Sequence, residues 1–84
     1  MSDEQQFPDD LVRLQREVLA AQRARHDYAQ RPDRDPAELH RLMAAESRAT
    51  IRLDNHPAMP GVQAEGRREE LRRAADAPDG PAGR

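Results

Sequence analysis

The sequence predicts an all-α protein whose main element is an antiparallel two-helix hairpin, and three observations lead to this prediction. Hydrophobic residues recur at helical spacing in two segments, at about 8–30 and 36–55. A connection of about five residues joins them, which favours antiparallel neighbours over separate helices. Charged residues make up 36% of the chain and Trp is absent, a composition typical of long helices rather than of a globule around a ligand cavity.

Size and composition exclude several classes of protein. A chain of 84 residues forms at most one small domain, whose core contributes about 3–5 kcal/mol. The absence of Cys excludes disulfides, thiol catalysis and thiolate metal sites. No apolar run approaches the roughly 20 residues that span a bilayer, and the first residues lack the layout of a signal peptide, so we expect a soluble cytoplasmic protein with no membrane partner. A net charge of −2 makes bulk attraction to nucleic acid weak.

The first helix is expected to follow a disordered N-terminal lead at residues 1–7. Pro8 suits the first helical position, and the two acidic residues after it favour the positive end of the helix dipole. The helix must end near Arg31, because Pro32 disfavours the α conformation in the residue before it. Its predicted inward stripe is Leu11, Leu14, Val18, Ala21, Arg25 and Tyr28.

The second helix begins with the strongest local signal in the chain. Asp35 is the predicted N-cap, Pro36 the first helical residue and Glu38 the third, as in a capping box. The helix should end at Asn55, since His56 precedes a proline. Its predicted inward stripe is Leu39, Leu42, Met43, Glu46, Ala49, Thr50 and Leu53.

Arg25 and Glu46 occupy central positions in the two stripes, where apolar residues are expected. In the antiparallel arrangement their side chains lean towards each other, because each points to the N-terminus of its own helix. We therefore predict that they meet and specify the register of the hairpin. The alternative is that both side chains turn outward to solvent.

A second apolar surface is predicted on the flanks of the hairpin, because same-side flanks of antiparallel helices come together. One hairpin buries too little apolar surface alone, so we expect this surface to contact another helical protein or a second copy, which as a homodimer would form a four-helix bundle. The predicted interface residues are Val12, Leu19, Ala44 and Ile51.

From residue 57 the composition changes to Ala, Arg, Glu, Gly and Pro. The segment AEGRREELRRAADA has helical Glu–Arg spacing, but Leu71 is its one large apolar residue. We therefore expect residues 57–84 to be a flexible, largely disordered tail with a short helix at about 63–76.

Candidate chemistry is sparse. His26 and His40 share a flank near the turn and could form a weak metal site or a pH-sensitive contact, but no HExxH-type pattern accompanies them, and exposed surface histidines are the favoured interpretation. Glu46 beside Arg25 lacks the third group and the cavity that an acid–base site needs. The sequence therefore predicts no catalytic residue, cofactor or metal, and no small-molecule substrate.

Residues at both ends of the hairpin carry a resemblance. The start FPDDLVRLQ, Tyr28, and the NHP that closes the second helix resemble small uncharacterised helical-hairpin proteins of GC-rich actinobacteria, which begin with FP-x-DL and carry HP after their second helix. The resemblance covers roughly residues 7–57. It implies the hairpin and no activity.

The function predicted from the sequence is a non-enzymatic protein–protein interaction module, a small adaptor or regulator that self-associates. The alternative is a small nucleic-acid-associated regulator that uses a basic face made of Arg41, Arg48 and Arg52. No aromatic residue accompanies this face for base stacking, so a solvated face with intrahelical ion pairs is the favoured interpretation.

Overall fold

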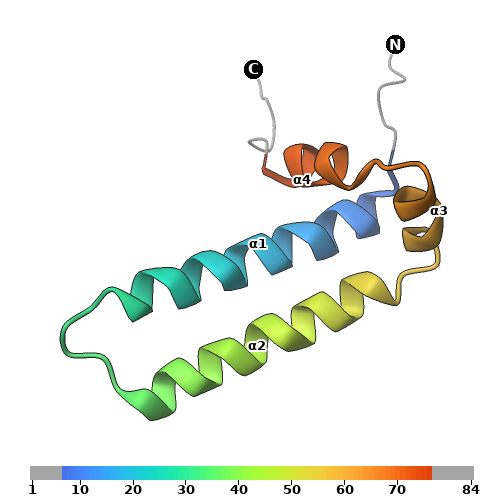
Figure 1. Cartoon of the computed structure of the whole chain (residues 1–84). Helices are drawn as coiled ribbons and strands as arrows, with labels where there is room; N and C mark the ends of the chain where they lie inside the picture. Colours follow the sequence, from blue (N-terminus) through green and yellow to red (C-terminus); the bar gives the residue numbers. More distant parts are fainter. Residues whose placement is uncertain (1–6, 77–84) are drawn as a thin grey trace.

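The computed structural model describes residues 7–76, and over this range every regular element is an α-helix (Figure 1). The helices are α1 (Asp9–Ala29), α2 (Pro36–Asp54), α3 (Met59–Ala64) and α4 (Arg68–Asp76). The predicted all-α class is therefore confirmed. Most of the predicted N-terminal lead and the last eight residues of the predicted tail lie outside the described residues.

Helices α1 and α2 lie side by side and run in opposite directions, which we call the α1–α2 pair (Figure 1). The N-cap of α2 is Asp35, whose carboxylate accepts a hydrogen bond from the Ala37 N–H at 3.1 Å. In the predicted capping box the Asp35 N–H would also donate to the Glu38 carboxylate, but here both groups have other partners. The Asp35 N–H donates to the Tyr28 hydroxyl at 2.7 Å, and the Glu38 carboxylate pairs with Arg41. The connection is thus tied to the end of α1 as well as to the start of α2.

The core lies at the end of the pair opposite the connection, where all four helices meet (Figure 1). Four large side chains in it, one from each helix or its border, have relative exposures of 0–1%: Leu11, Leu53, Met59 and Leu71. Their burial is completed by Phe7, Val18, Ala49 and Val62. Phe7, which the sequence analysis placed in a disordered lead, is 7% exposed, because it extends the apolar stripe of α1 into this cluster.

The C-terminal region differs in part from the flexible tail predicted for residues 57–84: helix α4 overlaps the short helix expected at about 63–76, but α3 was not expected. Residues 59–76 form two helices, and α4 lies along the first half of α1 (Figure 1). Leu71 and the smaller Ala75 are the buried residues of α4, and the Leu71 side chain enters a core that Met59 and Val62 of α3 already extend. Few apolar residues are needed when each one reaches the same cluster.

A Schellman motif at Gly66 turns the chain from α3 into α4. Gly66 has φ 67°, a left-handed conformation that costs glycine little. Its N–H donates to the Gln63 carbonyl at 3.1 Å, and the Arg67 N–H donates to the Val62 carbonyl at 2.9 Å. These two bonds satisfy the last carbonyl groups of α3 and direct α4 back over α1.

Polar contacts link the two ends of α4 to Phe7 and to the middle of α1. The Arg67 guanidinium lies 4.5 Å from the centre of the Phe7 ring, a cation–π contact. At the other end, Arg16 Nε donates to the Ala75 carbonyl at 3.0 Å and Arg23 lies 3.6 Å from the Asp76 carboxylate. Helix α4 is therefore held along α1 by contacts between residues far apart in the sequence.

Replacing Leu71 with Ala tests whether α4 belongs to the folded unit. We expect L71A to lower the free energy of unfolding by about 2–4 kcal/mol, because a fully buried side chain is removed from the shared core. Urea denaturation followed by circular dichroism measures it. R72A, at an exposed position on the same helix, should change stability by less than about 0.5 kcal/mol. Equal effects of the two substitutions would show that α4 is not packed as described.

Gln15 is a polar side chain that is buried beside the apolar core. Its side chain is 3% exposed, and its Oε1 has no hydrogen-bond partner among residues 7–76. Because a buried acceptor without a partner costs about 1–3 kcal/mol, Q15L should raise the free energy of unfolding by about 1 kcal/mol. The same urea titration measures the change, with Q63L at an exposed position as the control. A loss of stability in Q15L would mean that the amide is satisfied.

Candidate functional site

The four predicted interface residues lie in different environments. Val12 packs against the core, and Leu19 is half-buried beside α4 residues that include Glu69 and Arg73. Helix α4 thus occupies the side of α1 where a partner was expected. Ala44 is half-buried, while Ile51 is 57% exposed. The apolar flank that remains accessible therefore lies on α2.

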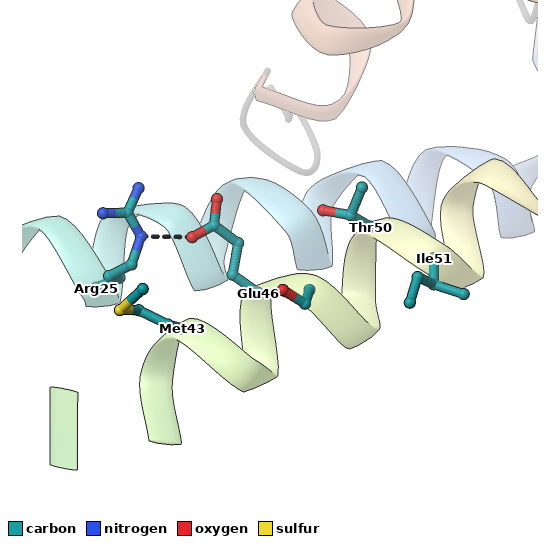
Figure 2. A pocket seen from close by; sticks show the side chains of 6 residues that line it. Arg25, Met43, Glu46, Thr50 and Ile51 are labelled. Carbon is teal, nitrogen blue, oxygen red and sulfur yellow. Dashed lines mark hydrogen bonds and ion pairs between the residues drawn. The ribbon is translucent and has the colours of Figure 1, made fainter. Parts of the chain in front are cut away.

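The accessible part of this flank borders an open groove between α1 and α2 (Figure 2). Met43 and Ile51 are the large hydrophobic side chains that remain exposed among the described residues, at 48% and 57%. Ser47 and Thr50 lie between them in the groove lining. Met43, Ser47, Thr50 and Ile51 form an uncharged strip between Glu46 on one side and Arg48 and Arg52 on the other, on a protein otherwise rich in charge.

Arg25 and Glu46 both line the groove, and the predicted contact between them is confirmed. Arg25 Nε donates to Glu46 Oε1 at 2.5 Å across the α1–α2 pair (Figure 2). The side chains are 39% and 21% exposed, so the pair is partly solvated. Such a pair contributes little net stability, and its main effect is to fix how α1 and α2 face each other.

The predicted inward stripes are packed most tightly near the core and more loosely towards the connection. Met43 differs from its predicted inward position, because it lies on the groove edge of the stripe and is 48% exposed. The buried members are Leu11, Val18, Ala49 and Leu53. The half-buried members are Leu14, Ala21, Arg25, Tyr28, Leu39, Leu42, Glu46 and Thr50.

The basic face predicted on α2 is partly neutralised. Arg41 pairs with Glu38 within the helix, and Arg52 Nη2 lies 3.1 Å from the Glu17 carboxylate of α1. Arg48 is exposed between them. The face therefore presents alternating charge rather than a continuous basic strip, which reduces its attraction for phosphate groups.

The three histidines have different roles. His26 and His40 are exposed, whereas the side chain of His56 is 11% exposed and makes two structural contacts. His56 Nδ1 accepts a hydrogen bond from the Ala58 N–H at 3.0 Å, so its Nε2 carries a proton that it donates to Asp10 Oδ2 at 3.1 Å. The sequence suggested only a helix end here. The contact fastens the junction of α2 and α3 to the first turn of α1.

Residues 7–76 contain no group of three His, Cys, Asp or Glu side chains placed to hold a metal ion. Nor does any helix there combine the length and apolar character needed to cross a membrane.

The Asp10–His56 contact predicts a dependence on pH. The hydrogen bond from His56 lowers the pKa of Asp10 below its ordinary value. Because the pKa is lower in the folded than in the unfolded state, ionised Asp10 stabilises the fold above the unfolded pKa. This contribution is lost as the pH falls through the folded pKa.

Carboxyl-detected NMR measures this pKa directly. We expect H56A to return the pKa of Asp10 towards its ordinary value, and D10N to make stability fall less steeply in the acid range. An unchanged pKa of Asp10 in H56A would contradict the contact.

Comparison with known proteins gives no relative from which a function for these surfaces could be inferred, so they are interpreted from their residues alone. No family model, curated protein or solved structure matches the chain. The resemblance to actinobacterial hairpin proteins therefore depends on the residues quoted for it.

Proposed function

We propose that this protein is a non-enzymatic protein–protein interaction module, a small cytoplasmic adaptor or regulator that self-associates. In this proposal α1 and α2 act as a helical hairpin, and two copies form a four-helix arrangement. The observation that carries the proposal is the exposure of Met43 and Ile51 on one side of α2. Exposed apolar strips bordered by polar residues are typical of protein-binding surfaces.

The groove beside this strip supports binding better than catalysis. Its one carboxylate, Glu46, is held by Arg25, and the remaining lining residues are two hydroxyl and two apolar side chains. An acid–base or nucleophilic mechanism needs an available base next to the nucleophile, and the carboxylate that lines the groove with Ser47 and Thr50 is engaged by Arg25. The groove can therefore offer shape and apolar contact to a partner.

The nucleic-acid alternative has less support. Two of its three arginines, Arg41 and Arg52, are engaged by carboxylates, and displacing those carboxylates would offset part of the gain from binding phosphate. The apolar strip on α2 has no such competing contacts.

The test replaces the two exposed apolar side chains of the strip with glutamate. We expect the wild type to sediment as a dimer at micromolar concentration, and M43E/I51E to sediment as a monomer that retains its helical circular dichroism. Two carboxylates placed in a desolvated contact are expected to cost several kcal/mol of association, or more than about a hundredfold in Kd. Analytical ultracentrifugation and light scattering measure the change.

A20E/A24E is the matched control, because it adds the same charge at two exposed positions of α1. This variant should remain dimeric. A wild type that stays monomeric at high micromolar concentration would contradict self-association, and equal weakening by the two variants would show that the strip has no special role.

A further inference from the structure

The exposed side of α2 has a symmetric sequence about Ser47. Three residues at seven-residue spacing, His40, Ser47 and Asp54, lie along one line of the helix, and all are exposed. On one flank of that line are Met43 and Thr50, and on the other are Ala44 and Ile51, each set lying three or four residues from Ser47. We call these seven residues the α2 stripe: His40, Met43, Ala44, Ser47, Thr50, Ile51 and Asp54.

A second α2 running antiparallel matches this pattern when a two-fold axis passes through Ser47. Residues equally far from Ser47 then lie level, and same-side flanks meet. His40 faces Asp54 of the other copy. The large Met43 meets the smaller Thr50 on one flank, and the large Ile51 meets the small Ala44 on the other. Large side chains opposite small ones are the arrangement that lets two helices interdigitate.

The parallel arrangement fits less well. It would bring His40 against His40 and Asp54 against Asp54, and it would set Met43 and Ile51 level with their own copies. Carboxylates facing each other repel, whereas an imidazole N–H facing a carboxylate can donate a hydrogen bond to it. Asp54 is loosely paired with Arg68 at 3.8 Å, and a carboxylate has a second oxygen for a histidine. Charge complementarity therefore selects the antiparallel orientation.

The centre of the stripe allows two helices to approach closely. Ser47 is small, and its hydroxyl can bond to the backbone carbonyl four residues earlier, so its contact needs no polar partner. Between His40 and Asp54, about 21 Å along the helix, the stripe carries no charge. Glu46, one residue from the axis, is neutralised by Arg25 at 2.5 Å, which limits repulsion between its two copies.

We propose that two copies of this chain associate through an antiparallel contact between their α2 stripes, with Ser47 on the two-fold axis. This inference rests on the proposed function and specifies its partner and geometry. It assigns a further effect to the Arg25–Glu46 pair, which neutralises Glu46 on the Met43–Thr50 edge of the interface, while the exposed Arg48 lies on the opposite edge.

Single cysteines test the geometry, because the chain contains none. S47C should oxidise to a covalent dimer, doubling the mass of most of the protein, since the two sulfur atoms lie at the axis. H40C and D54C should each remain monomeric after oxidation alone, and their equimolar mixture should give a covalent heterodimer. A20C, exposed on α1, is the control for random collisions. Mass spectrometry and non-reducing gels detect the products.

Sedimentation of the wild type, run beside these reactions, separates the two proposals. A dimeric wild type with efficient S47C cross-linking and a cross-linked H40C–D54C mixture supports the α2 contact. A dimeric wild type whose S47C variant cross-links no better than A20C overturns the contact and leaves self-association standing. Self-linked H40C and D54C would overturn the antiparallel orientation. A monomeric wild type at high micromolar concentration overturns both self-association and the contact.

Discussion

The contact of Leu71 with the apolar end of the α1–α2 pair determines the rest of the arrangement. Two amphipathic helices with few large side chains bury little surface, and here the missing area is supplied from the same chain by Met59, Val62 and Leu71. Once Leu71 is buried, α4 must lie along α1, and its position decides which flank of the pair remains accessible. Burial of one leucine thus connects stability to the location of the candidate binding surface.

Local chemistry made the first two helices predictable. Prolines and Asp35 fix their ends, since proline and N-cap preferences depend only on neighbouring residues. The Arg25–Glu46 contact was predictable for the same reason, because a short connection and helical periodicity determine which positions face each other. The absence of the second capping-box bond, from the Asp35 N–H to Glu38, was not predictable, because the Asp35 N–H donates instead to the Tyr28 hydroxyl of the preceding helix.

The Glu–Arg spacing predicted a short helix at about 63–76, where α4 lies, but neither α3 nor the packing of α4 was predictable, because both depend on contacts distant in sequence. A window around α4 contains Leu71 as its one large apolar side chain, and periodicity gives no sign that a site for it exists beside Leu11 and Leu53. Gly66 was the local signal for the turn between the two helices, since a glycine just after a helix is typical of a Schellman motif. Because the packing of α4 was not predictable, the interface prediction included Val12 and Leu19, which lie on the side of α1 that α4 occupies. Ile51 remains accessible.

The bond from Arg16 to the Ala75 carbonyl joins residues 59 positions apart, and this separation has a consequence for how the chain folds. The connection between α1 and α2 can close early at small entropic cost, but it is held mainly by polar contacts and has little apolar surface to retain it. Most of the stabilising apolar burial is gained only when the two ends of the folded segment meet. During synthesis on a ribosome, α1 and α2 are therefore incompletely stabilised, with their apolar end exposed to solvent, until α4 has been synthesised. Chaperone binding would be most effective during this interval.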